Sequence, residues 1–295
     1  MSSYKITCCS TADLPPSYYE ERGVPLATFH YDMDGVQYPD DMGKTMPLSE
    51  FYSRIEAGSM PVTSQVNTEG YVALFEPFLS AGIDVLHLSL SSGISGSYFS
   101  AKIAEQDLRV KYPERKLYVI DSQAASSGYG LLVDKALDLQ AAGSSIDEVY
   151  EYIEVRKLHL QHLFFATSLK HLKRGGRISA TSAMVGALLS IVPICDVNNE
   201  GKLIPRSKAR GKKHAIAELV TRMKAHADHG TRYSGKVFIS QSACREDAET
   251  LANAIRAEFP DIDGEIRINN IGSVIGAHTG PGTVALFFWG DKRGE

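Results

Sequence analysis

The sequence predicts an α/β fold in which helices cover both faces of a mainly parallel sheet. Short apolar runs typical of buried strands alternate with helical patterns through the first half of the chain. One such run, Val85–Leu90, passes through a turn of serines and glycines directly into a helical pattern. Alternation of this kind is typical of parallel sheets. The 295 residues are enough for two domains, each with its own core.

The first half of the chain supplies three predicted strands and four predicted helices. The strands are the apolar runs Lys5–Cys9, Val85–Leu90 and Lys116–Ile120. Three helices follow from apolar residues spaced three and four apart, and we expect them at Glu69–Ala81, Ser97–Tyr112 and Ser127–Ala142. A fourth helix begins after Ser145 and runs to about Lys157, because Ser145 and Glu148 have the spacing of a capping box.

The pattern changes after the apolar run Leu163–Ala166. A polar, basic and glycine-rich segment, Ser168–Ile178, is followed by small residues up to Ile194. We therefore expect a junction near residue 160, with an N-terminal α/β domain over residues 1–160 and a C-terminal α/β domain over residues 161–295. In the second domain we expect strands at Ile191–Val197, Lys236–Ser240, Glu265–Ile268 and Val284–Trp289, and helices at Ala215–Ala227 and Asp247–Glu258.

Composition excludes several classes of protein. The net charge of −4 argues against a nucleic-acid binder. The four cysteines form no CxxC pair, and the histidines show no ligand spacing, so we expect no metal and a reducing, cytoplasmic location. We expect no signal peptide, because the first residues lack a basic segment followed by a long apolar one. The most apolar stretch, Ala180–Ile194, is interrupted by polar residues and is shorter than the ~20 residues of a membrane span, so we expect no stable membrane insertion.

The turn at Ser91–Ser97 is suited to holding an anion. Hydroxyls and bare backbone N–H groups gather there at the start of a helix, where the helix dipole is positive. No lysine lies in the turn, which excludes a nucleoside-triphosphate loop. A hydrolase elbow needs G-x-S-x-G, and Ser97 stands in place of the second glycine. An ordinary helix cap is the remaining alternative.

Three other segments carry candidate functional residues. Pro61–Gln65 is a second hydroxyl-rich turn, and Thr63 or Ser64 there could donate to an oxyanion or serve as an ordinary cap. His278 precedes the tight turn Gly280-Pro281-Gly282, which could hold it as a hydrogen-bonding group or leave it on the surface. The basic run Lys202–Lys213 predicts either a positive surface for an acidic partner or a solvated face.

Taken together and in order, six segments resemble the DegV family of bacterial fatty-acid-binding proteins. They are Ser10–Leu14, Pro61–Gln65, Ser91–Tyr98, Val119–Ser122, Leu169–Ile178 and His278–Gly282. The resemblance covers nearly the full length of the chain. It implies a two-domain α/β protein that encloses one long-chain fatty acid in a buried tunnel between the domains. Val192 departs from the family, which often has lysine at that position.

The resemblance also implies roles for individual residues. Thr63, Ser95 and Gly96 are implied to hold the fatty acid carboxylate, with His278 near the head group. The family resembles carriers without catalysis of their own and without cofactors, which present the acid to a separate, ATP-dependent fatty acid kinase for acyl-phosphate formation. We expect Arg177, Arg206 and Arg210, which belong to the basic segments, to form the surface for that partner.

Two other functions remain open from the residues alone. One is an acyl hydrolase with Ser95 as nucleophile, His278 as base and Asp121 as orienting group. The other is an interaction protein that binds no ligand and uses the surface formed by Lys202–Lys213.

Elementary energetics agree with a fatty acid carrier. Burying an unpaired carboxylate is costly, and hydroxyl and backbone N–H donors offset that cost without adding a fixed charge. Burial stabilises each methylene by ~0.8 kcal/mol, so a chain of about sixteen carbons contributes roughly 10 kcal/mol before ordering losses. We expect the small apolar stretch Ala180–Ile194 to line the tunnel.

Overall fold

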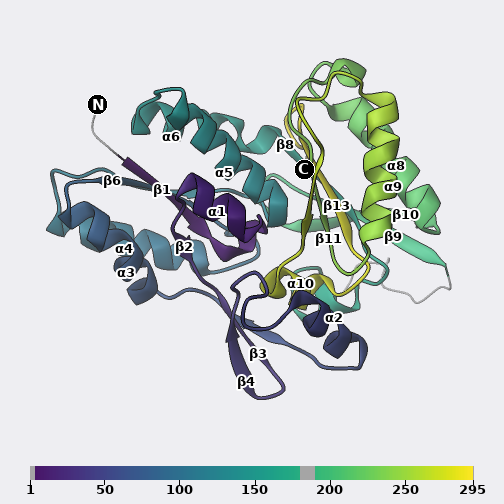
Figure 1. Ribbon diagram of the computed structural model, residues 1–295, viewed down its shortest axis with the longest axis horizontal. Coiled ribbons are helices and arrows are strands. Elements are labelled where there is room, and N and C mark those ends of the chain that lie inside the picture. Colours follow the sequence, from purple (N-terminus) through teal and green to yellow (C-terminus); the bar gives the residue numbers. More distant parts are fainter. Residues whose placement is uncertain (1–3, 180–189, 295) are drawn as a thin grey trace.

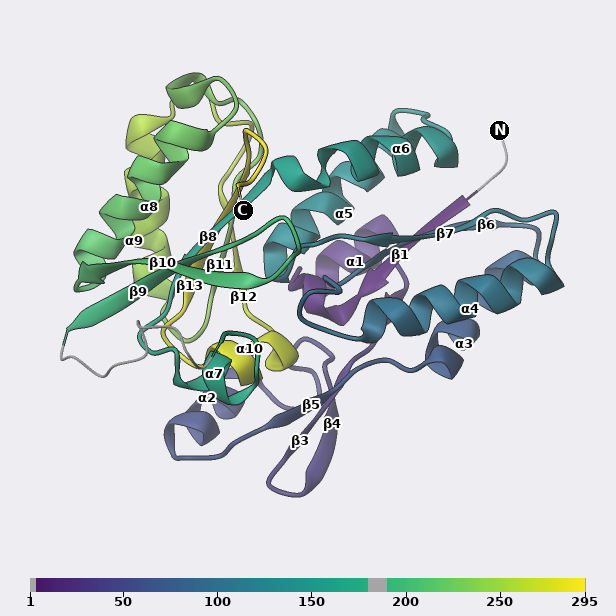
Figure 2. The ribbon, with the colours of Figure 1, turned by 180° about the vertical axis from the view of Figure 1, so that it is seen from behind.

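The computed structural model describes residues 4–179 and 190–294, and its fold is α/β, as predicted (Figures 1 and 2). The first sheet is parallel and has the strand order β2-β1-β6-β7. Its strands are β1 (Tyr4–Cys9), β2 (Leu26–Ala27), β6 (Asp84–Ser89) and β7 (Leu117–Asp121). The three predicted strands are confirmed, with ends displaced by one residue at most.

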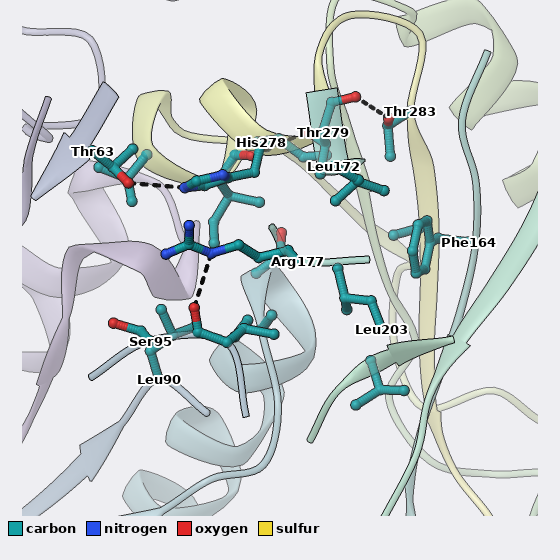
Figure 3. Close-up of a pocket in the computed structure, with 18 of the residues that line it drawn as sticks. Thr63, Leu90, Ser95, Phe164, Leu172, Arg177, Leu203, His278, Thr279 and Thr283 are labelled. Atoms are coloured by element: carbon teal, nitrogen blue, oxygen red, sulfur yellow. Dashed lines mark hydrogen bonds between the residues drawn. The ribbon is translucent and has the colours of Figure 1, made fainter. Parts of the chain in front are cut away.

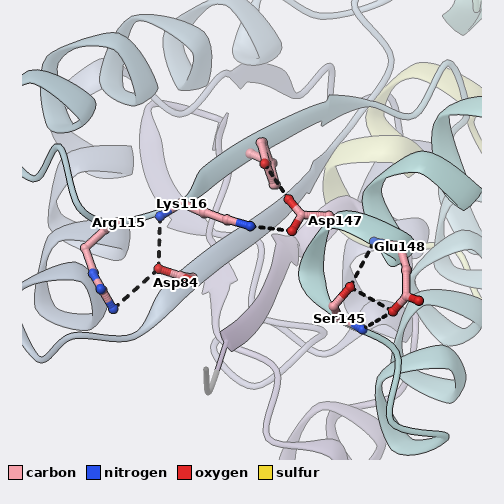
Figure 4. Close-up of polar contacts among 7 residues, drawn as sticks. Asp84, Arg115, Lys116, Ser145, Asp147 and Glu148 are labelled. Carbon is pink, nitrogen blue, oxygen red and sulfur yellow. Dashed lines mark hydrogen bonds and ion pairs between the residues drawn. The ribbon is translucent and has the colours of Figure 1, made fainter. Parts of the chain in front are cut away.

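Helices cover both faces of this sheet, as Figure 2 shows. Helices α3 (Thr68–Ser80) and α4 (Ser97–Lys111) lie on one face, and α5 (Ser126–Ala141) and α6 (Ile146–Arg156) lie on the other. The predicted capping box is present at the start of α6 (Figure 4): the Ser145 hydroxyl accepts from the Glu148 N–H, and the Glu148 carboxylate accepts from the Ser145 N–H at 2.7 Å. Lys116, directly before β7, forms an ion pair with Asp147 of α6.

The second sheet has six strands in the order β10-β9-β8-β13-β11-β12. They are β8 (Leu160–Phe165), β9 (Ile191–Val197), β10 (Leu203–Arg210), β11 (Phe238–Gln241), β12 (Arg267–Asn270) and β13 (Val284–Trp289). Neighbours are antiparallel except β11 and β12, which are parallel. The division into domains at residue 160 stays a prediction, although the first strand of this sheet begins there.

The two faces of the six-stranded sheet serve different cores. Leu163 and Phe165 pack with α8 (Lys212–His226) and α9 (Arg245–Glu258) in a second hydrophobic core. Phe164, which lies between them in β8, packs with the core of the first sheet. Successive strand residues point to opposite faces, so this sheet shares its inner face with the rest of the molecule.

Several elements escaped sequence prediction. The helices are α1 (Pro16–Arg22), α2 (Leu48–Glu56), α7 (Lys170–Arg174) and α10 (Ser273–Thr279), with 3-10 turns at Ser10–Ala12, Lys157–His159 and Gly230–Arg232. A small antiparallel sheet, β4-β3-β5, is made of β3 (His30–Met33), β4 (Val36–Pro39) and β5 (Val62–Ser64).

One predicted turn needs correction. Pro61–Gln65 is not a turn, because Val62–Ser64 pairs with β3, whose residues precede it by about thirty positions. His278 lies before the predicted turn Gly280-Pro281-Gly282, in the last turn of α10, which Gly280 caps with a φ of 70°. Among the described residues, no helix has both the length and the apolar character needed to cross a membrane.

Candidate functional site

A cavity of about 410 Å³ lies at the inner face of the six-stranded sheet. Ligand pockets for small molecules have volumes of about 300–1,000 Å³. Apolar side chains from distant parts of the sequence form most of its wall, among them Phe164, Leu172, Leu203, Val274 and Phe287. Figure 3 shows that Phe164, Leu172 and Leu203 lie at one end, away from Thr63 and Ser95. The cavity therefore has a polar end and an end lined mainly by apolar side chains, where the hydroxyls of Thr279 and Thr283 donate to the backbone carbonyls of Ile275 and Thr279.

Thr63 and His278 meet at the polar end (Figure 3). The Thr63 Oγ1 lies 2.8 Å from the His278 Nε2 and shares a hydrogen bond with it. Thr63 comes from β5 and His278 from α10, which lie 215 positions apart in the sequence. Both line the cavity. A Cβ atom at Gly175, the residue after α7, would collide with the His278 Nδ1, so this glycine makes room for the imidazole ring.

The imidazole of His278 is neutral at neutral pH. Burial, followed by the positive charges of Arg177 and Arg174, lowers the pKa of His278 to about 4. The Nδ1 is buried and has no hydrogen-bond partner among the described residues. The neutral imidazole of His278 and the hydroxyl of Thr63 can form hydrogen bonds at this end of the cavity, and neither carries a charge.

Ser95 lies on the loop between β6 and α4, and it also lines the cavity. Its N–H donates to the Ser91 carbonyl at 3.1 Å, and its hydroxyl accepts from the Ser97 N–H at 3.2 Å. Gly96 precedes α4 and packs closely against Gln65. A Cβ atom at Gly96 would collide with the Gln65 side chain. The structure brings Thr63, Ser95 and His278 together around one cavity, whereas Gly96 does not contribute to the described lining.

Arg177 is half-buried and lines the cavity. Its Nε donates to the Ile94 carbonyl at 3.0 Å, and its Nη1 donates to the Gly175 carbonyl. Partial burial lowers the pKa of its guanidinium. Arg177 thus places a positive charge beside the polar end. Sequence reasoning assigned Arg177 to a partner surface, and that role stays a prediction. The spacing of a basic segment does not tell which of its side chains line a cavity.

The other two predicted partner residues lie elsewhere. Arg206 and Arg210 stand on β10 with exposed side chains, and neither lines the cavity. The Arg206 Nε donates to both oxygens of Asp196, at 2.9 and 2.8 Å. From the sequence, this basic run was predicted to form a surface, and strand β10 was not predicted, although charged residues are common on edge strands.

The geometry does not assemble the triad of an acyl hydrolase. The Asp121 carboxylate accepts from the N–H groups of Ser92 and Gln123, at 3.0 and 3.1 Å, and from the Ser92 hydroxyl. Asp121 thus caps the turn after β6 and does not orient His278, whose Nε2 bonds Thr63 instead. Ser95 therefore lacks the base and orienting group that such a nucleophile needs.

The predicted tunnel-lining stretch Ala180–Ile194 falls mostly outside the described residues. Within its described part, Val192 and Ile194 pack in the second core with α8 and α9. The apolar lining that sequence reasoning missed comes from β8, β10 and β13 and from α7 and α10. No group of three or more His, Cys, Asp or Glu side chains in residues 4–179 and 190–294 has the arrangement of a metal site.

Comparison with known proteins places these features in a family. A family model described as "Uncharacterised protein, DegV family" matches residues 3–291. A DegV domain-containing protein of Clostridium perfringens is 41% identical over 293 residues, which cover 99% of each chain.

Two solved structures have the same fold. One is described as "Fatty Acid Binding of a DegV family Protein from Thermus thermophilus"; it is 28% identical, has a TM-score of 0.86, and the match covers 99% of this chain and 100% of that one. The other, the Streptococcus pneumoniae "Fatty Acid Kinase (Fak) B3 protein" loaded with linoleic acid, is 22% identical with a TM-score of 0.84, covering 98% and 100%. The family match and the identity to the Clostridium protein, both over nearly the whole length, show that this chain belongs to the DegV family.

Proposed function

We propose that this protein binds a long-chain fatty acid in the cavity and presents its carboxylate, in the cytoplasm, to a separate fatty acid kinase. The observation that carries the proposal is the division of one cavity into a polar end, with Thr63, Ser95 and His278, and an apolar end. The Thermus thermophilus relative, whose description names fatty acid binding, supports the same ligand class.

The chemistry of the polar end suits a carboxylate. The hydroxyls of Thr63 and Ser95 can each donate one hydrogen bond, and Arg177 supplies a nearby positive charge. A carboxylate held by such donors avoids the cost of burial without a partner. The apolar wall excludes water from the hydrocarbon, and this exclusion provides most of the affinity.

Presentation to a kinase is the second part of the proposal. It is supported by the resemblance of the six sequence segments and by the description of the Streptococcus pneumoniae neighbour, which names a fatty acid kinase protein. The sequence has no G-x-x-x-x-G-K-[ST] segment, so we assign ATP binding to the partner. In this scheme the chain is a lipid-binding subunit and not itself an enzyme.

Reconstitution tests the kinase step. The chain loaded with oleate is mixed with ATP and the ATP-binding subunit of a fatty acid kinase, and acyl phosphate is trapped with hydroxylamine and quantified. We expect acyl phosphate only when all components are present. Product formed equally well without this chain would contradict the proposal, as would the absence of product with a kinase that is active on another loaded carrier.

A further inference from the structure

The turn between β9 and β10, Asn198–Lys202, connects the six-stranded sheet to the loop that carries Ser95. Val197 and Leu203 flank the turn, are paired across the two strands, and both line the cavity. The turn is internally bonded: the Asn198 side chain accepts from the N–H groups of Glu200 and Lys202, at 3.1 and 2.9 Å. The hairpin therefore provides part of the cavity wall, and its turn extends beyond that wall as an ordered unit.

Side chains from three segments hold this turn in place. The Ser91 hydroxyl donates to the Gly201 carbonyl at 2.9 Å, and the Gln123 amide donates to the Asn199 carbonyl at 2.9 Å. Arg293 is buried and donates to the carbonyls of Gln123 and Val197, at 3.1 and 3.4 Å. The turn is thus bonded to the ends of β6 and β7.

Two glycines allow the chains to approach closely at this contact. A Cβ atom at Gly93 would collide with the Glu200 carbonyl oxygen and would lie 2.8 Å from the Gly201 carbonyl carbon. These are backbone atoms, so they cannot turn aside as the end of a long side chain does. A Cβ atom at Gly201 would collide with the Ser91 hydroxyl. The contact therefore has no space for a further methyl group on either side.

Ser91 links this contact to the polar end of the cavity. Its carbonyl accepts from the N–H groups of Ile94 and Ser95, at 3.2 and 3.1 Å, while its hydroxyl holds the turn. Ile94 and Ser95 both line the cavity. One residue therefore positions Ser95 through its main chain and the hairpin wall through its side chain.

We propose that these contacts, between the Asn198–Lys202 turn and Ser91, Gly93 and Gln123, form a latch that controls release of the bound fatty acid. The inference rests on the proposed function. With the latch closed, Ser95 and the wall residues Val197 and Leu203 are held together around the ligand. Opening it frees both at once. The Asn199 Oδ1 is buried without a partner among the described residues, so opening also lets that oxygen reach water.

Release of oleate to fatty-acid-free serum albumin tests the latch. Ser91→Ala removes the bond to Gly201, and Gly93→Ala inserts a methyl group into the contact without straining the backbone, since Gly93 lacks a positive φ. We expect both variants to release oleate at least tenfold faster than the wild-type chain. The matched controls are Ser80→Ala, which removes a serine bond to the Pro77 carbonyl on the surface, and Gly294→Ala, where a Cβ atom meets nothing within 4 Å.

A second measurement needs no ligand. Gln123→Ala lies outside the Ser95 loop and removes only the bond to Asn199. We expect it to speed amide hydrogen exchange across residues 94–97 in the ligand-free protein by at least fivefold, whereas Ser80→Ala should leave that exchange unchanged. If the wild-type chain takes up oleate, the release rates test the latch: rates within twofold of wild type in both Ser91→Ala and Gly93→Ala overturn it. If the wild-type chain takes up no oleate, the proposed function fails. In that case unchanged amide exchange in Gln123→Ala overturns the latch separately.

Discussion

Thr63 and Ser95 are the hydroxyl residues on which the proposed carboxylate site depends most. Both line the cavity, and each would leave the carboxylate short of a donor if it were replaced by alanine. We expect Thr63→Ala and Ser95→Ala each to weaken oleate binding by ~1 to 3 kcal/mol. Titration calorimetry measures this directly. The matched controls Thr221→Ala and Ser80→Ala remove hydroxyls that bond backbone carbonyls on exposed helices, and they should bind oleate as the wild-type chain does. Unchanged affinity in both site variants would contradict the assignment.

His278 predicts a pH dependence of stability. Its pKa is about 4 in the folded chain and ordinarily about 6.5, so between these values the unfolded chain binds more protons. Stability that His278 contributes at pH 7 is therefore lost as the pH falls through this window. When the pH falls from 7 to 5, the free energy of unfolding decreases in the wild-type chain. We expect this decrease to be smaller by about 1 to 2 kcal/mol in His278→Gln.

Urea unfolding at the two pH values measures that difference. His87, whose pKa burial lowers to about 3, changes stability in the same direction but is present in both chains, so its contribution cancels. An equal loss of stability in the variant and in the wild-type chain would show that His278 is not held neutral by its surroundings.

At the scale of elements, α7 and α10 position the polar end by packing against each other. Gly175 ends α7 with an ordinary φ of −72°, so alanine is permitted by the backbone there. Its methyl group would displace the His278 ring and break the bond to Thr63. We expect Gly175→Ala to weaken oleate binding at least fivefold, with Gly294→Ala as the matched control. Wild-type affinity in a folded Gly175→Ala chain would show that the position of His278 is unimportant.

The elements differ in how far the sequence predicted them. Strands β1, β6 and β7 are apolar runs between turn residues, and the capping box at Ser145 identifies the start of α6, so local signals were enough. Strand β5 has only three residues and depends on pairing with β3, which no local pattern reveals. Strand β10 carries exposed basic residues on alternate positions, and this pattern resembles a solvated segment until the neighbouring strand is known.

The residues of the site also differ in how far the sequence predicted them. Thr63, Ser95 and His278 were predicted from a family resemblance, and the structure places all three around one cavity. Arg177 and the apolar lining were not predicted in that place, because they depend on how distant segments pack. Phe164 illustrates the reason: its strand is buried on both faces, and only the sheet pairing tells which face meets the cavity.

At the scale of the whole molecule, the cavity and the exposed arginines of the edge strand β10, Arg206 and Arg210, are separate surfaces. We expect Arg206→Glu and Arg210→Glu to lower acyl-phosphate formation by the kinase at least fivefold, since charge reversal opposes an acidic partner. Oleate affinity should stay within twofold of wild type, because neither residue lines the cavity. Lys224→Glu, on α8, is the control for a change of charge away from β10. A loss of oleate affinity in place of kinase turnover would assign these arginines to ligand binding.

The cavity as a whole belongs to neither sheet alone, since β5, α10 and the inner face of the six-stranded sheet all contribute to it. Under the proposed function, the cavity encloses a hydrocarbon within apolar walls and holds its carboxylate at the hydroxyl end. Mass spectrometry of the lipid extracted from the purified chain, with its molar ratio to protein, tests that property most directly. We predict a long-chain fatty acid at close to one per chain. A chain that carries no fatty acid and also fails to take up added oleate would contradict the account.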